Sequence, residues 1–190
     1  MNVIQDLLPV NQYSRPERKL KDVYAVVVHW PQWAGSTAKQ VRDYFANDIK
    51  KEHRYGSAHY CVDDTIVQCI PDDEMAYHCG SLRPDPASGK IYTDLARTVF
   101  GEYASSRLSP NMVSIGIEVC HIDSMGAMKP ETVQNVIELV ATLCATYNLD
   151  PSKQVLRHYD VVGWKVCPRW WVNHPESWSE FIQSVEEFAI

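Results

Sequence analysis

Hydrophobic and polar positions along the chain fall into two kinds of pattern, and the first predicts β-strands. VYAVVVH, residues 23–29, is apolar and β-branched without alternation, which is typical of a central strand covered on both faces. SIGIEV, residues 114–119, alternates instead. Glu118 therefore shares a face with Gly116, whose missing side chain would leave room for a ligand. QVLR, residues 154–157, indicates a further short strand.

The second pattern places apolar residues at the three- and four-residue spacing of amphipathic helices. Ser36 or Thr37 can cap a helix that continues to about Lys50. The clearest helix spans 130–148 and has a proline at its start. A last helix begins at Pro175, and its inward positions are predicted to be Trp178, Phe181, Ile182, Val185 and Phe188.

Turn residues separate these elements. SAHYCVDDTIVQCIPDD, residues 57–73, predicts a β-hairpin around Asp63 and Asp64. With a two-residue loop, Cys61 and Cys69 would not be opposite partners.

Residues 81–111 are rich in Pro, Ser and Gly and predict an irregular segment with one short helix near 94–103. Because a loop of this length in a compact domain is usually functional or mobile, we expect it to border a substrate cleft. Strands interleaved with helices predict an α/β fold, with a central mixed β-sheet flanked by helices. No repeat or linker divides the chain, so residues 1–190 are expected to form a single domain.

Composition and charge exclude several classes of function. The chain has 190 residues, of which 45% are hydrophobic, and carries a net charge of −6. No basic run is interleaved with aromatic residues, so a nucleic-acid partner is not expected. The longest apolar run, AVVV, is far shorter than the roughly 20 residues of a bilayer span, so no membrane association is expected either. We expect a monomer whose six cysteines are free thiols, most of them buried.

HYDVVGWKVCP, residues 158–168, combines three reactive groups in a segment that is too interrupted to predict a helix. Imidazole and thiolate are preferred zinc donors, and a catalytic zinc has three protein ligands. His158 and Cys167 could supply two, and His29 is the best placed third because a strand end holds an imidazole rigidly. The alternative is that all three are ordinary core residues, since their spacing matches no zinc-finger pattern.

Two further side chains could carry chemistry. In an extended segment Lys165 would project to the side of Cys167, where its charge would favour the thiolate and stabilise a developing oxyanion. Glu118 is a carboxylate on an otherwise apolar strand, where burial raises its pKa, so it is the candidate proton carrier. The alternatives are a solvent-exposed lysine and a salt-bridged structural glutamate.

Of the other histidines, His78 and His59 are predicted to contact substrate, while those at 53, 121 and 174 look peripheral. His78 precedes the long segment 81–111, and His59 lies in the predicted hairpin. The tryptophans at 164, 170 and 171 are expected to pack in the core rather than to stack on a sugar.

Five segments taken together resemble a known family: VVVHW, SAHYCVDD, AYHCG, SIGIEV and RHYDVVGWKVCP, preceded by YSRP. In this order they are similar to the zinc-dependent N-acetylmuramoyl-L-alanine amidases of type 2, which include phage lysozyme-like amidases, prophage endolysins and peptidoglycan recognition proteins. The resemblance implies the phage lysozyme-like amidase fold, one catalytic Zn2+, and hydrolysis of the amide between N-acetylmuramic acid and L-alanine of the peptidoglycan stem peptide. By position it implies His29, His158 and Cys167 as zinc ligands, and Glu118 and Lys165 as catalytic groups.

Three departures from the family pattern bear on the site. Trp164 is an extra residue between the second histidine and the cysteine, so the loop would have to bulge. Ala58 stands where some phage members have a tyrosine, which moves acid–base work onto Glu118. Residues 81–111 form a longer segment than expected, which would reshape the stem-peptide groove.

Two other functions are also compatible with the sequence. A recognition module that binds muropeptide without cutting it is the main alternative, although Cys167, Glu118 and Lys165 argue against it. A redox or structural protein that uses its six thiols is the third. Residues 1–20 do not read as a secretory signal, so we expect synthesis in the cytoplasm, with access to the cell wall after a holin-type release.

Overall fold

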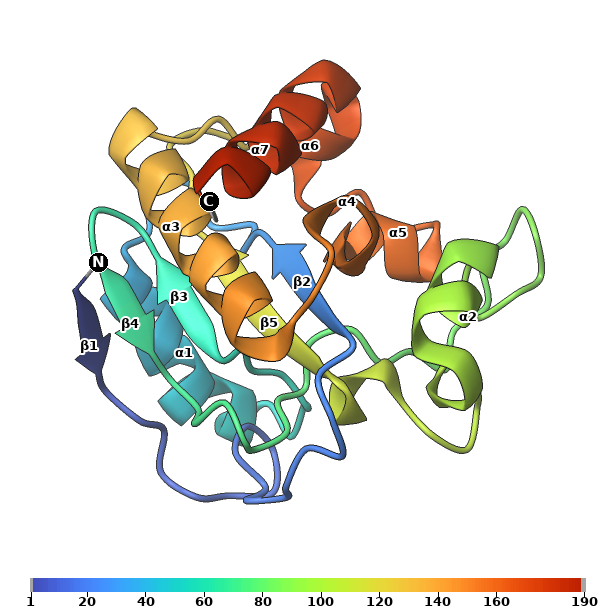
Figure 1. Ribbon diagram of the computed structural model, residues 1–190. Helices are drawn as coiled ribbons and strands as arrows, with labels where there is room; N and C mark the ends of the chain where they lie inside the picture. The colour runs from blue at the N-terminus through green and yellow to red at the C-terminus, as the bar shows by residue number, and fades with distance from the viewer. Residues whose placement is uncertain (1, 189–190) are drawn as a thin grey trace.

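A computed structural model describes residues 2–188 and contains a β-sheet with helices on both faces (Figure 1). The strands are β1 (Val3–Gln5), β2 (Ala25–His29), β3 (Tyr60–Val62), β4 (Ile66–Gln68), β5 (Ser114–Val119) and β6 (Val155–Arg157). The α-helices are α1 (Ala38–Lys51), α2 (Asp94–Phe100), α3 (Pro130–Tyr147), α4 (Pro151–Gln154), α5 (His158–Val162), α6 (Arg169–Asn173) and α7 (Pro175–Phe188). Two 3-10 turns are η1 (Gly101–Tyr103) and η2 (Pro110–Met112).

The strands pair in the order β1-β4-β3-β5-β2-β6. Strands β3, β5, β2 and β6 are mutually parallel, whereas β4 runs antiparallel to β3 and pairs in parallel with β1. The sheet is therefore mixed, which confirms the predicted fold class. Because β5, β2 and β6 are parallel neighbours, their carboxyl ends meet at one edge of the sheet.

Both faces of the sheet are covered, which explains why every residue of β2 is buried. Helices α3 and α7 pack on the face that carries Ile115, Ile117 and Val119. Figure 1 shows α3 crossing this face and α1 lying behind the opposite one. Helices α2 and α5 pack over Ala25 and Val27, on the side opposite α3. The non-alternating apolar pattern of β2 thus reflects burial on two sides.

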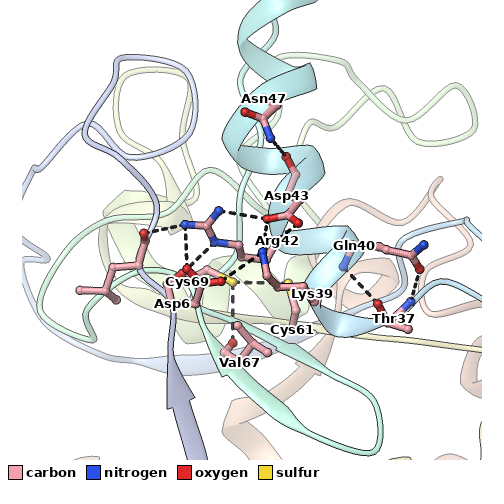
Figure 2. Close-up of polar contacts among 11 residues, drawn as sticks. Asp6, Thr37, Lys39, Gln40, Arg42, Asp43, Asn47, Cys61, Val67 and Cys69 are labelled. Atoms are coloured by element: carbon pink, nitrogen blue, oxygen red, sulfur yellow. Dashed lines mark hydrogen bonds and ion pairs between the residues drawn. The ribbon is translucent and has the colours of Figure 1, made fainter.

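Helix α1 is capped at its start and is hydrogen-bonded to the N-terminal segment. Thr37 is the N-cap: its hydroxyl accepts from the Gln40 backbone nitrogen, and the Gln40 side chain accepts from the Thr37 nitrogen (Figure 2). This selects Thr37 from the two predicted caps. Arg42 donates to the carbonyls of Asp6 and Leu7 at 2.9 and 2.8 Å, which ties α1 to the segment that follows β1.

The predicted hairpin forms, but its register differs by one residue. Val62 pairs with Ile66, so the loop has three residues rather than two. Thr65 is the extra loop residue, and both its backbone nitrogen and its hydroxyl donate to the Asp63 carboxylate. The sulfurs of Cys61 and Cys69 lie 3.6 Å apart (Figure 2), but Cys61 pairs with Val67 in the register, so the prediction that the two cysteines are not opposite partners is confirmed. All six cysteines are free and buried, as predicted.

Two further predictions need correction. Residues 158–168 were expected to lack a helix, but α5 forms at their start because the Asp160 carboxylate accepts from the Arg157 backbone nitrogen at 2.8 Å and caps the first turn. Phe188 was expected to face inward, yet it is 50% exposed because the last turn of α7 extends beyond the core. The short elements β1, α4 and α6 were not predicted.

The long elements follow the sequence closely. Helix α3 begins at Pro130 and ends at Tyr147, and the C-cap residue Asn148 has the left-handed conformation common after a helix C-terminus. The short helix expected near 94–103 appears as α2 followed by η1. No helix within residues 2–188 combines the length and the apolar character that a membrane span requires.

Candidate metal centre

Three predicted metal ligands meet at the edge of the sheet where the parallel strands end. His29 is the last residue of β2, and His158 directly follows β6. Since Val28 pairs with Arg157 in the register of these neighbouring strands, the two imidazoles face each other with 3.0 Å between their Nδ1 atoms. The Cys167 sulfur lies 3.9 Å from the His29 Nδ1. The donor atoms of His29, His158 and Cys167 all lie within 4.8 Å of one another, and all three residues are buried.

The protonation states of these groups suit a metal ion. Burial holds the pKa of His29 and of His158 well below the usual value, so both imidazoles are neutral and keep a lone pair. Burial raises the pKa of the Cys167 thiol to about 12; Glu118 adds to this increase and Lys165 opposes it. Lys165 thus acts in the predicted direction, but burial outweighs it. A thiolate in this position needs a further positive charge, which a bound metal ion would provide.

The segment that carries Cys167 is held against α5. The Tyr159 backbone nitrogen donates to the Cys167 carbonyl at 3.0 Å. Arg157 and Asp160 form a two-pronged ion pair, with side-chain contacts at 2.8 and 2.9 Å. The third guanidinium nitrogen of Arg157, Nη1, donates to the Trp171 carbonyl at 3.0 Å. These bonds fix both ends of the loop between α5 and α6, and therefore the position of the sulfur.

Trp164, which was predicted to be an extra residue of this loop, packs against the long segment. The Arg83 guanidinium stacks 4.4 Å from the centre of the Trp164 ring. The preceding Gly163 has a φ of +79°, a conformation that side-chain-bearing residues rarely adopt, and it turns the chain out of α5. Partial burial of Trp164 against α2 and α5 agrees with a core role for this ring, and Trp171 is buried as well.

Glu118 lies beside the ligands on the adjacent strand. It is the register partner of His29 across β2 and β5. Its Oε2 atom is buried and has no hydrogen-bond partner among residues 2–188. Burial raises the pKa of this carboxyl to about 7, although Lys165 opposes the increase. This agrees with the predicted rise in the Glu118 pKa. The alternative of a salt-bridged structural glutamate is not observed, because Glu118 forms no ion pair within residues 2–188.

His78 contacts one of the ligands directly. Its Nδ1 lies 3.0 Å from the His29 Nε2, and its Nε2 lies 3.2 Å from the Ser114 hydroxyl. Burial lowers its pKa to about 3, so the ring is neutral. A Cβ at Gly116 would stand only 2.5 Å from the His78 ring. Gly116 therefore makes room for His78, which corrects the expectation that it makes room for a ligand.

His59 has a different environment from the one predicted. It is fully buried, its Nδ1 accepts from the Gly116 nitrogen at 3.0 Å, and its Nε2 lies 2.8 Å from the Glu74 carbonyl. Since both ring nitrogens are engaged by backbone groups, this position does not support a substrate contact for His59. His121 was expected to be peripheral but is buried against the Trp30 ring, 4.7 Å between ring centres.

The ligands and Glu118 open into a cavity of about 960 Å³. Its lining includes several residues of 81–111, so the prediction that this segment borders a cleft is confirmed. Lys165 also lines the cavity. The sequence did not predict which aromatic residues line the cavity, because they come from several segments and share no spacing signal. They are Trp30, Trp33, Tyr44, Phe45, Tyr55, Tyr77 and Tyr92.

Comparison with known proteins settles the family. Residues 19–170 match the family model described as N-acetylmuramoyl-L-alanine amidase. The chain belongs to this amidase family. A probable N-acetylmuramoyl-L-alanine amidase of Bacillus licheniformis is 35% identical over 187 residues, which is 98% of this chain and 48% of the relative. The amidase BlyA of Bacillus subtilis (strain 168) is 32% identical over 180 residues, 94% of this chain and 45% of the relative. The chain thus spans about half the length of the curated relatives it matches.

Solved structures of amidases share the fold. The catalytic domain of XlyA superposes with a TM-score of 0.66 at 25% identity and covers 97% of this chain and 99% of that one. The solution structure of the PlyG catalytic domain gives a TM-score of 0.71 at 22% identity, covering 100% and 96% of the two chains. The predicted single-domain, phage lysozyme-like architecture is therefore the fold of this amidase family member.

Proposed function

We propose that this domain is a zinc-dependent N-acetylmuramoyl-L-alanine amidase that cuts the amide between N-acetylmuramic acid and L-alanine of the peptidoglycan stem peptide. The observation that carries the proposal is that His29, His158 and Cys167 converge, with Glu118 beside them, and that all four residues line the cavity. Family membership supports this reaction, and relatives named as amidases of this type support the substrate.

The donor set favours zinc among the metals that these residues could hold. Two neutral imidazoles and one thiolate give a mixed nitrogen and sulfur set, and three protein ligands leave one position open for water or substrate. When bound there, zinc would polarise the amide carbonyl and lower the pKa of a water molecule to about 7.

Glu118 and Lys165 would carry the remaining chemistry. A carboxyl whose pKa is about 7 can accept a proton from the attacking water and return it to the leaving amine at neutral pH. The buried Oε2 atom makes no competing hydrogen bond among residues 2–188, so it is available for this transfer. The Lys165 ammonium, which lines the cavity, would stabilise the negative charge that develops on the carbonyl oxygen.

His78 would hold the His29 ring in position, in addition to any contact with substrate. The His29 Nδ1 faces the other two donor atoms, so the proton of this ring belongs on Nε2, from where it donates to the His78 Nδ1. The His78 Nε2 would then donate towards Ser114, whose own hydroxyl donates to the Pro110 carbonyl at 2.7 Å. This chain of bonds would fix the orientation of the metal-binding ring.

The test is cleavage of a defined muropeptide. Zinc-loaded protein should release a peptide with a new L-alanine amino terminus, detected by mass spectrometry. Cys167→Ala should lose both bound zinc and cleavage, whereas Cys144→Ala, at a buried thiol of α3 outside the site, should keep both. Binding of muropeptide without release would instead identify a recognition module. The monomeric state and a holin-type route to the cell wall stay predictions.

A further inference from the structure

The charged residues that line the cavity are mostly basic, whereas acidic residues predominate in the whole chain. The chain has 24 acidic and 18 basic residues. In contrast, the basic residues Arg18, Arg54, Arg107 and Lys165 line the cavity, and Glu118 is the one acidic lining residue within residues 2–188. The cavity is therefore a positively charged recess in an acidic protein, and a field of this kind favours anionic ligands.

Two of these arginines are available to bind an anion. Arg18 and Arg107 are exposed, and neither guanidinium forms a hydrogen bond or ion pair with any other residue of the described chain. Arg54 is also exposed, but it already lies 3.3 Å from the Glu52 carboxylate. Because a guanidinium offers paired donors that match the two oxygens of a carboxylate, the unpaired arginines are suited to bind that group.

Arg18 belongs to a wall made by the N-terminal segment and the segment before His78. Its carbonyl accepts from the Met75 nitrogen at 2.7 Å, and its positive charge acts on the Tyr77 hydroxyl. The Tyr77 ring packs on Tyr55, 5.2 Å between ring centres. All four of these residues line the cavity, so the Arg18 charge is set beside an aromatic surface.

Arg107 belongs to the long segment 81–111. Asn111 ties the end of this segment to the residues around His78, because its side-chain oxygen accepts from the backbone nitrogens of His78, Cys79 and Gly80 at 2.8 to 3.1 Å. A fixed wall therefore presents Arg107 to the same space that holds the metal ligands. The two arginines reach one cavity from segments that are far apart in the sequence.

We propose that the cavity selects N-acetylmuramoyl peptides whose stems carry free carboxylates, and that Arg18 and Arg107 bind those carboxylates. This inference rests on the proposed function, because it specifies which peptides that same site prefers. The stem peptide is the part of the substrate that bears ionised groups, so its carboxylates are what a positively charged recess would distinguish. A carboxamide in their place has no charge and presents an NH2 group to the arginine.

The experiment compares two synthetic N-acetylmuramoyl peptides that differ only in carrying stem carboxylates or the corresponding carboxamides. For the zinc-loaded protein, kcat/KM should favour the carboxylate form by about tenfold or more, as expected for charge-assisted hydrogen bonds. Arg18→Gln and Arg107→Gln should each reduce this ratio, and the double variant should bring it close to one. High salt should also reduce the ratio, because screening weakens exposed charge interactions.

Arg97→Gln is the matched control, since Arg97 is exposed on α2 and does not line the cavity. This variant should keep the wild-type ratio. Equal rates for the two peptides in the wild-type protein would overturn the inference while leaving the amidase function intact. A preference that survives in the double variant would overturn the assignment to Arg18 and Arg107.

Failure of the proposed function would give a different result, namely no cleavage of either peptide. Calorimetric binding to the Glu118→Gln protein keeps the inference testable in that case, because it measures the preference as a ratio of dissociation constants. Tighter binding of the carboxylate peptide, lost in the arginine variants, would support the charge selection without cleavage. Equal affinities for the two peptides would overturn it.

Discussion

Replacing Glu118 with glutamine should remove the reaction and stabilise the metal-free protein at the same time. The carboxyl has a pKa raised by burial from 4.5 to about 7, so the folded protein holds a proton there that the unfolded chain loses above about pH 4.5. The charged form is therefore disfavoured in the fold. A shift of about 2.5 units corresponds to up to about 3 kcal/mol of lost stability, at 1.36 kcal/mol per unit.

The sign of the effect follows from proton binding. Between pH 4.5 and 7 the folded state holds more protons at Glu118 than the unfolded state, so stability from this group falls as pH rises and is lowest above pH 7. Glutamine has no charge to bury. The free energy of unfolding of Glu118→Gln should equal that of the wild type near pH 4.5 and exceed it by up to about 3 kcal/mol at pH 8. The buried histidines also titrate, but they are common to both proteins and cancel in the difference.

Urea unfolding of chelator-treated protein at the two pH values measures this difference. The zinc-loaded variant should keep its metal and lose roughly a hundredfold or more in kcat, because it has no group to transfer the proton. Glu102→Gln, at an exposed residue of η1, is the control and should change neither quantity. Equal stability of Glu118→Gln and wild type at pH 8 would refute the burial argument, and near-normal cleavage would require another base.

Substitutions at three other positions probe the surroundings of the candidate ligands. His78→Ala should weaken zinc binding by roughly ten- to a hundredfold, measured by competition with a chelator, because His29 loses the acceptor that orients it; unchanged affinity would contradict this role. Gly116→Ala should destabilise the protein by about 1–3 kcal/mol in urea unfolding, since its Cβ would meet the His78 ring at 2.5 Å. The double variant His78→Ala/Gly116→Ala should cost less than the sum of the single changes. Asp160→Asn should lower both thermal stability and zinc affinity, because Arg157 loses its charged partner; a loss of stability alone would show that the pair does not position the ligands.

The sequence determined the parts of this protein that depend on local pattern. The apolar run that precedes His29 predicted that β2 is covered on both faces, and the spacing of apolar residues in α3 predicted that helix to within a residue of its ends. Glu118 could be identified as a perturbed carboxyl because strand alternation alone places it among buried neighbours. The candidate metal ligands were predicted from residue chemistry and from the resemblance of their segments to a family, and the structure brings their donor atoms within 4.8 Å of one another.

Tertiary structure decided what depends on contacts between distant segments. The register of β2 against β5 and β6 sets Glu118 and His158 beside His29, and no local pattern encodes that register. No local pattern encodes the proposed positioning role of His78 either, because it depends on a bond to His29, which lies 49 positions away in the sequence. Short elements such as α5 were missed because a helix of one turn depends on a single capping bond rather than on periodicity. The charge of the cavity was also hidden from the sequence, because folding gathers a few arginines from separate segments while most carboxylates of an acidic chain stay outside.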